Sequence, residues 1–375
     1  MARNPITSRA YLEINLTNLK HNCKEVKSIL PKETELVAVV KANAYGHGIE
    51  GVADAVADIV DTFAVATLNE ALKLRNNGVE NDIILLGGID EGQYETAVQN
   101  SVTLTVFSYE SAKKISRTAK RLNVFCDCRI KLDTGMSRLG FGITKKELKE
   151  VQKIFKLPNI KISGIYSHLA SAGEDEDFAL KQISRFDNAL DFFKKKGIDC
   201  GKSGILNSGG ILSLKSFYSS VRAGIILYGV YPFEAESEIH IKPVMSVKAR
   251  IQQIKTLNRG TEVGYGCEFI TKEKTKAAVL SIGYADGVPR SLAKEGYVLI
   301  KGCRAKILGR ICMDLTTVDI TNIPGVTLND EATLIGEDGE QKITVTEMAR
   351  ICSTIPYEIM CGFDKERMGK VYLEK

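Results

Sequence analysis

The sequence predicts an α/β protein: an N-terminal (β/α)₈ barrel of the TIM type, followed by a C-terminal domain that is mostly antiparallel β. The first observation is a strand-then-helix rhythm that repeats between residues 36 and 224. Strands separated by helices pair in parallel, and eight such units over roughly 230 residues fit a closed barrel better than an open sheet. The second observation is a change near Pro243, after which short β-like segments are separated by glycine turns. We therefore expect a barrel over residues 1–242 and a β domain over residues 243–375.

The barrel elements follow from short apolar runs and amphipathic segments. A first alternating segment, Tyr11–Asn15, precedes a helical stretch that ends near Leu30. The eight expected barrel strands are Leu36–Val40, Thr62–Val65, Ile83–Leu86, Thr103–Val106, Cys128–Leu132, Lys161–Ser167, Ile205–Asn207 and Ser220–Gly224. The clearest helices between them are Leu68–Asn77, Ser108–Leu122, Lys145–Phe155 and Phe178–Lys196.

The C-terminal part shows β-like segments with a single helical pattern, Thr346–Ser353. The polar segment from Tyr231 to Pro243 is the expected linker between the two parts. The expected strands are Val244–Ile254, Ala277–Ile282, Tyr297–Ile300, Cys303–Ile311, Thr316–Asp319 and Glu331–Leu334.

Composition excludes several classes of protein. The net charge is only +5, and basic residues are interspersed with acidic ones, so we expect no nucleic-acid partner. No apolar run approaches 18 residues, which argues against a membrane span, and the N-terminus lacks the apolar core of a signal peptide. Nine cysteines with irregular spacing and no CxxC motif predict neither a zinc site nor a disulfide framework. We expect a cytoplasmic protein without a bound metal.

One lysine has the setting of a reactive amine. The apolar run Leu36–Val40 leads directly into Lys41, and small residues and glycines follow in the stretch VVKANAYGHG. A lysine at the end of a buried strand loses hydration, which lowers its pKa and favours Schiff-base formation. The alternative is a solvated lysine just beyond a strand end, and the strand pattern alone leaves both open.

Other polar residues follow the later strands, at the end of a barrel where chemistry takes place. Ser208 and Gly224 would offer donors near the last two strands, where barrels commonly bind phosphate. A lysine, a group of phosphate-binding donors and an arginine together suggest pyridoxal 5'-phosphate. The remaining candidates at these strand ends are Lys131, Arg138, His168 and Arg222.

Eight segments in register carry a specific resemblance. They are AVVKANAYGHG, KLDTGMSRLG, SHLASAGEDED, NSGG, VRAGIILYGVYP, EVGYGCEF, IGYADGVPR and LGRICMDLTTVD. Together they resemble the alanine racemase family, from Ala10 to about Phe363. The resemblance implies a pyridoxal phosphate-dependent racemase that interconverts L-alanine and D-alanine and supplies D-alanine for peptidoglycan.

The resemblance also implies two catalytic bases on opposite faces of the substrate. Lys41 resembles the lysine that holds the cofactor and acts as one base. Tyr265 resembles the second base, which reaches the site from the partner subunit of a homodimer. Met313 resembles the residue whose backbone contacts the substrate carboxylate across the dimer. A monomer would therefore have an incomplete site.

The remaining roles are implied by the same resemblance. Arg222 matches the arginine at the pyridine nitrogen, and His168 the residue that orients it. Arg138 resembles the arginine near the substrate carboxylate, and Lys131 aligns with a lysine that is often carbamylated. The phosphate-binding set matches Tyr45, Ser208, Gly224, Ile225 and Tyr357.

Related activities remain as alternatives. A serine or broad-specificity amino-acid racemase of the same fold is the closest, although Tyr357 would narrow the pocket toward a methyl side chain. A decarboxylase of this fold would need a cysteine-centred motif in the β domain, and a barrel-only cofactor carrier would lack that domain. Two departures from the family pattern are the tail GFDKERMG, which lacks Arg-Val-Pro-Arg, and Cys267 close to Tyr265.

Overall fold

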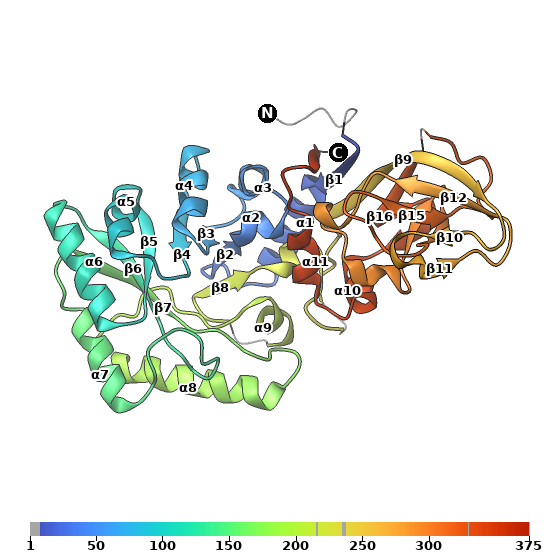
Figure 1. Ribbon diagram of the computed structural model, residues 1–375. Coiled ribbons are helices and arrows are strands. Elements are labelled where there is room, and N and C mark those ends of the chain that lie inside the picture. The colour runs from blue at the N-terminus through green and yellow to red at the C-terminus, as the bar shows by residue number, and fades with distance from the viewer. Residues whose placement is uncertain (1–7, 215–216, 235–237, 329, 375) are drawn as a thin grey trace.

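The computed structural model describes residues 8–214, 217–234, 238–328 and 330–374. Figure 1 shows a parallel sheet surrounded by helices in one part and a β-rich part at the other end of the molecule. These features confirm the predicted fold class. The expected linker, residues 231–243, lies partly outside the described residues at 235–237, as do residues 1–7 of the expected first domain.

The N-terminal part is built on a seven-stranded parallel sheet in the order β7-β6-β5-β4-β3-β2-β8. Every residue of β2 and β3 is buried, the apolar residues together with the polar Glu35 and Thr62 at the strand starts. The strands are β2 (Glu35–Val39), β3 (Thr62–Val65), β4 (Asp82–Leu85), β5 (Val102–Val106), β6 (Cys126–Lys131), β7 (Ile160–Tyr166) and β8 (Ser220–Ala223).

The eighth expected strand, Ile205–Asn207, is reduced to a bridge that links the two edges of this sheet. Gly204 pairs with Tyr166 of β7 as an isolated parallel bridge. On the other side, the backbone N–H groups of Ser220 and Arg222 in β8 donate to carbonyls of residues 203 and 206, both at 3.1 Å. The segment therefore closes the ring of strands without forming a regular strand of its own.

Helices cover the outside of the sheet, and six of those named below begin at a side-chain cap. Thr67 and Thr144 form capping boxes with Glu70 and Glu147. The helices of this part are α1 (Leu16–Ser28), α2 (Lys41–Tyr45), α3 (Ile49–Val56), α4 (Leu68–Asn76), α5 (Tyr94–Gln99), α6 (Tyr109–Arg121), α7 (Lys145–Ile154), α8 (Glu176–Lys194) and α9 (Ser208–Ser213).

The C-terminal part is mostly antiparallel, around the long strand β9 (Met245–Leu257), which pairs with β1, β12 and β16. Its further strands are β10 (Glu262–Val263), β11 (Phe269–Ile270), β12 (Thr275–Leu280), β13 (Tyr297–Ile300), β14 (Cys303–Lys306), β15 (Thr316–Asp319), β16 (Glu331–Asp338), β17 (Gln341–Ile343) and β18 (Gly369–Leu373). The departure in the tail sequence thus does not prevent the last strand from forming.

Two elements differ from the expectation. The first strand, β1 (Ala10–Asn15), was expected with the barrel but pairs with β9 and β18 of the C-terminal sheet. The single expected helix is α10 (Val345–Ile351), and a second helix, α11 (Pro356–Gly362), follows it. Pro356 stands at the start of α11, where the missing N–H costs nothing. Helix α11 packs against α2 and so joins the two parts of the chain.

A buried ion pair crosses the interior of the barrel. Arg129 of β6 and Glu35 of β2 meet at 2.6 Å, and both side chains are 6% exposed. The hydroxyls of Thr62 and Ser220 donate to the two carboxylate oxygens at 2.8 and 2.6 Å. Four strands are thereby connected through a single carboxylate.

Candidate functional site

A pocket of about 680 Å³ opens at the carboxyl ends of the parallel strands. It contains all the site residues that the sequence analysis places in the barrel, together with Tyr357 of α11. These residues are Lys41, Tyr45, Lys131, Arg138, His168, Ser208, Arg222, Gly224, Ile225 and Tyr357. The pocket therefore unites positions that are more than 300 residues apart in the sequence.

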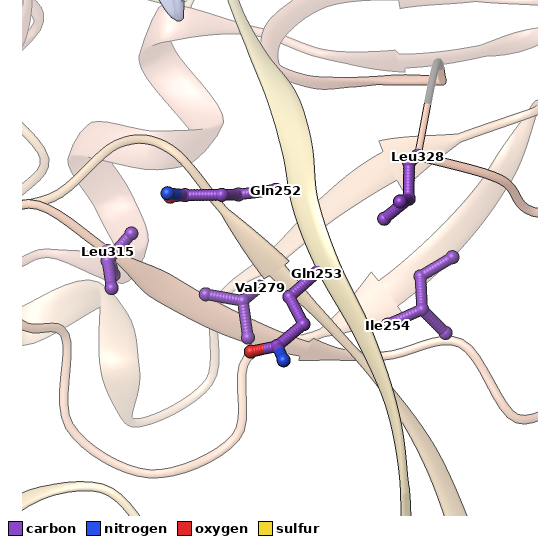
Figure 2. A pocket seen from close by; sticks show the side chains of 6 residues that line it. All are labelled: Gln252, Gln253, Ile254, Val279, Leu315 and Leu328. Carbon is purple, nitrogen blue, oxygen red and sulfur yellow. The ribbon is translucent and has the colours of Figure 1, made fainter.

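A second, more open pocket of about 550 Å³ lies on the β domain. Figure 2 shows Gln252, Gln253 and Ile254 of β9 beside three apolar side chains. None of the predicted site residues lines it. It shares no lining residue with the first pocket.

Lys41 begins a turn of unusual backbone conformation. The next four residues, Ala42 to Tyr45, have φ between 52° and 55°, which is the left-handed helical region. For residues with a side chain this region costs about 1–2 kcal/mol each. Such strain persists only where the surroundings enforce it, and it is typical of functional sites. This turn was not predicted from the sequence, although the cluster of Asn43, Gly46 and Gly48 is a signal for positive φ.

Side chains from distant elements hold this turn. The Asn43 amide donates to both carboxylate oxygens of Asp364 at 2.9 and 3.0 Å, and its oxygen accepts from the Ile49 N–H at 2.9 Å. The Asp364 carboxylate also pairs with Lys370 at 2.5 Å. Glu70 accepts from the Ala42 N–H at 2.6 Å. The direction of Lys41 is therefore set jointly by the barrel and the C-terminal segment.

The electrostatic setting of Lys41 favours its neutral amine. Burial lowers the pKa of Lys41 below its ordinary value, and the positive charge of Arg138 lowers it further. Glu70 acts in the opposite direction. The net shift is the one expected from a lysine that serves as nucleophile or base.

Basic groups dominate the middle of the pocket. Burial lowers the pKa of Lys131 well below its ordinary value, and Arg222 and Arg138 add to the effect. Lys131 and Arg222 both lie over the ring of Tyr166, with 4.6 Å and 5.0 Å to its centroid. Tyr166 was not predicted as a site residue, yet its ring contacts two basic side chains of the pocket.

Arg222 is buried, and His168 is partly buried beside it. The Arg222 guanidinium donates to the carbonyls of Ser167 at 2.5 Å and Ile205 at 3.2 Å. Burial lowers the pKa of His168 well below its ordinary value, and the charge of Arg222 acts in the same direction. His168 is therefore neutral. The hydrogen bonds of the nearby Arg222 guanidinium go to main-chain oxygens.

The far end of the pocket carries neutral hydrogen-bonding groups. The Ser208 hydroxyl accepts from the Gly224 N–H at 2.9 Å, and Ser208 opens α9 behind the cap Asn207. A Cβ added to Gly224 would lie 2.8 Å from the Tyr45 hydroxyl oxygen. Glycine thus leaves a space around which the hydroxyls of Tyr45 and Ser208 converge.

Two predicted site residues lie outside this pocket. Tyr265 is 70% exposed and Met313 is 52% exposed, both on loops of the β domain. Tyr284 is also exposed, and its loop is bonded to the Met313 segment through the N–H groups of residues 284 and 285. Cys267 is exposed two residues after Tyr265. Within one chain the structure therefore separates Lys41 from Tyr265.

Neither a membrane helix nor a metal cluster is found in the described ranges. No helix there has the length and apolar character needed to cross a membrane. No group of three or more His, Cys, Asp or Glu side chains in the same ranges is arranged to hold a metal ion.

Comparisons with known proteins agree with the resemblance seen in the sequence. The family models "Alanine racemase, N-terminal domain" and "Alanine racemase, C-terminal domain" match residues 14–232 and 244–372. The alanine racemase of Methanococcus maripaludis is 40% identical over 97% of this chain and 98% of its own length. That of Clostridium tetani is also 40% identical, over 97% of this chain and 95% of its own length.

Solved structures give the same result. The alanine racemase of Clostridium difficile 630 has a TM-score of 0.92 and 35% identity, covering 98% of this chain and 96% of that chain. The alanine racemase of Bartonella henselae with covalently bound pyridoxal phosphate has a TM-score of 0.86 and 32% identity, covering 98% and 100%. The two family models, the curated relatives and the solved structures therefore show that this chain belongs to the alanine racemase family.

Proposed function

We propose that this protein interconverts L-alanine and D-alanine with bound pyridoxal phosphate, using Lys41 and Tyr265 as bases on opposite faces of the substrate. The observation that carries the proposal is the position of Lys41. It projects from a strained left-handed turn at the rim of a pocket whose far end holds hydroxyl donors. A relative, the Bartonella henselae enzyme, is described with covalently bound pyridoxal phosphate.

The donor set of the pocket fits this cofactor. Four basic side chains line the pocket, Lys41, Lys131, Arg138 and Arg222, and the acidic residue Glu174 also lines it. An anionic phosphate ester would balance part of this charge. The space at Gly224, between the hydroxyls of Tyr45 and Ser208, is a suitable phosphate site, with Ile225 and Tyr357 completing it. When bound, the cofactor supplies an electron sink that acidifies the substrate α-proton.

The chain's own residues then divide the remaining work. Lys41, with its lowered pKa, removes or returns a proton at Nζ on one face. Arg222, held by the Ser167 and Ile205 carbonyls, would offer a positive charge to the ring nitrogen of the bound cofactor, with neutral His168 nearby. Arg138 binds the substrate carboxylate. We infer that Lys131, whose pKa is lowered by burial and by the charges of Arg222 and Arg138, reacts as a neutral amine with carbon dioxide and releases a proton. The resulting carbamate would place an anion near the two arginines.

We further propose a homodimer with shared sites. Tyr265 and Met313 are exposed and absent from the pocket of their own chain. A two-fold arrangement that brings each pair to the partner's pocket would complete both sites at once. Without it, the proton on the face opposite Lys41 has no acceptor.

We place the enzyme in the cytoplasm, as a source of D-alanine for peptidoglycan. The cysteines are all free thiols, which suits a reducing compartment. Expression of the chain should restore the growth of a bacterial D-alanine auxotroph without added D-alanine, whereas a Lys41→Ala variant should not. Failure of the wild-type chain to support growth, although it is expressed, would contradict this role.

The reaction itself has a direct test. Purified protein incubated with L-alanine in deuterated water should yield D-alanine and incorporate α-deuterium, because each proton removed is exchanged with solvent. L-Serine measured in parallel tests the alternative, a serine or broad-specificity racemase. We expect alanine to be preferred because Tyr357 borders the pocket. Absence of both products with the cofactor bound would contradict racemisation, and equal rates would favour the alternative.

Gly224→Ala is expected to weaken pyridoxal phosphate binding by about tenfold or more. The new methyl group would lie 2.8 Å from the Tyr45 hydroxyl oxygen and displace a phosphate ligand. Fluorescence titration of apoprotein with the cofactor measures the effect. Gly92→Ala is the matched control, because nothing lies within 4 Å of its added Cβ. Unchanged affinity in Gly224→Ala would remove this region from the phosphate site.

A further inference from the structure

His47 is a buried histidine that the mechanism above does not use. Its side chain is fully buried, directly after the left-handed turn that carries Lys41 and Tyr45. Its Nδ1 lies 2.9 Å from the Ala44 carbonyl oxygen and 3.1 Å from that of Tyr45. Its Nε2 has no hydrogen-bond partner in the described part of the chain. A buried ring nitrogen without a partner is costly and calls for an explanation.

The contacts fix the protonation of the ring. Carbonyl oxygens only accept hydrogen bonds, so Nδ1 must carry the proton and donate to both. Burial lowers the pKa of His47 to about 4, so the ring is neutral and Nε2 has no proton near neutral pH. The imidazole is therefore a neutral donor with one defined tautomer.

The accepting carbonyls belong to the strained turn itself. Ala44 and Tyr45 have φ of 55° and 52°, and the Ala44 carbonyl also accepts from the backbone N–H of His47 at 3.0 Å. A donor at this point stabilises the left-handed conformation, because relaxation toward the right-handed region would turn both carbonyls away from Nδ1. The hydrogen bonds of His47 thus act on the residues that join the base Lys41 to the phosphate ligand Tyr45.

Stacking holds the ring in place. The His47 ring lies on Tyr228, with centroids 4.5 Å apart and planes inclined by 29°. Tyr228 also packs on Tyr45 at 4.9 Å and donates its hydroxyl to the Val39 carbonyl at the end of β2. The stacked rings of His47, Tyr228 and Tyr45 therefore connect the strand before Lys41 to the turn after it.

We propose that His47 is a positioning residue for racemisation, whose Nδ1–H locks the left-handed turn so that Lys41 and Tyr45 face the same pocket. The inference rests on the proposed function for its catalytic meaning. The lack of a partner for Nε2 then follows from the position of the ring, because a ring that stacks on Tyr228 and donates from Nδ1 leaves Nε2 facing no donor among the described residues.

Three proteins test the proposal. His47→Phe keeps a stacking ring but removes the donor, whereas His47→Asn places an amide N–H close to the position of Nδ1. Ser116→Ala is the matched control, because it removes another buried donor, to the Pro158 carbonyl at 2.5 Å, on the outer helix α6. All are compared with the wild type by melting temperature, amide hydrogen exchange of peptides covering residues 41–48, and cofactor titration.

We expect His47→Phe to accelerate exchange in the turn by about 10- to 100-fold and to weaken cofactor affinity over a similar range. His47→Asn should recover most of both, and Ser116→Ala should lower the melting temperature without either effect. Wild-type exchange in His47→Phe, or identical behaviour of the Phe and Asn variants, would overturn the proposal.

If His47→Phe does not fold, His47→Gln replaces it. Gln places its amide near Nε2, so His47→Asn must then show slower exchange than His47→Gln, and equal rates reject the role of Nδ1. Exchange needs no cofactor, so this comparison decides the role of His47 separately. Failure of the wild type to bind pyridoxal phosphate would instead contradict the proposed function.

Discussion

Mixing Lys41→Ala protein with Tyr265→Phe protein is expected to restore racemase activity that neither possesses alone. Lys41 lines the barrel pocket, whereas Tyr265 is 70% exposed on a loop of the β domain and does not line that pocket. If Tyr265 serves the partner's pocket, a hybrid dimer has one site with both bases and one site with neither. Each parent should be slowed by about 10²–10⁴-fold, the range of a lost general acid or base.

The expected recovery can be stated in advance. Random exchange of subunits makes half of the dimers hybrids, and half of the sites in each hybrid are complete. The mixture should therefore reach about a quarter of wild-type activity per subunit. Activity is measured before and after dissociation and reassociation, with native mass spectrometry to count hybrids. Hybrids that form without gaining activity would show that the two residues act within one chain or not at all.

Much of the barrel could be predicted because its signals are local. The run Leu36–Val40 is apolar and rich in β-branched valine, and it forms the buried strand β2 that leads to Lys41. The clustering of Arg222 and His168 with Lys41 follows from the same logic, because the carboxyl ends of parallel strands meet at one edge. Local pattern and topology together were sufficient for this part of the site.

The features that sequence reasoning missed depend on distant partners. Strand β1 alternates like any half-exposed strand, but its partners β9 and β18 are more than 200 residues away, so its sheet could not be inferred. The left-handed turn depends on Asp364 for the orientation of Asn43, and Tyr166 gains its role only when two cations lie over its ring. Tertiary contacts decided these features.

Glu35→Gln is expected to destabilise the protein by about 3–5 kcal/mol, the usual cost of leaving a buried charge without its partner. Arg129 is as buried as Glu35, and its Nε lacks a hydrogen-bond partner among the described residues, so its charge depends on this carboxylate. Denaturant midpoints at neutral pH measure the loss. Glu95→Gln is the matched control, because the Arg121–Glu95 pair has the same 2.6 Å separation but is exposed. That change should cost at most about 1 kcal/mol.

A double replacement distinguishes the net contribution of the ion pair from the cost of leaving Arg129 without its partner. Glu35→Leu combined with Arg129→Met removes both charges together, so no ion remains unpaired, and stability should return toward the wild-type value. The double variant measures the net contribution of the ion pair, whereas Glu35→Gln measures mainly the penalty on the remaining arginine. A double variant that is less stable than Glu35→Gln would mean that the pair itself, rather than the avoidance of a lone charge, stabilises the barrel.

The same pair sets a pH dependence with a defined sign. Burial alone would raise the pKa of Glu35, but Arg129 and the hydroxyls of Ser220 and Thr62 bring it below its ordinary value of 4.5. Because the folded pKa is the lower one, the stabilisation is complete above the unfolded pKa and is lost as the pH falls through the folded one. The wild type should therefore lose stability relative to the double variant when the pH is lowered below about 4.5. A difference that stays constant across this range would mean that the pKa of Glu35 is the same in the folded and unfolded states, so that its pairing with Arg129 contributes no pH-dependent stability.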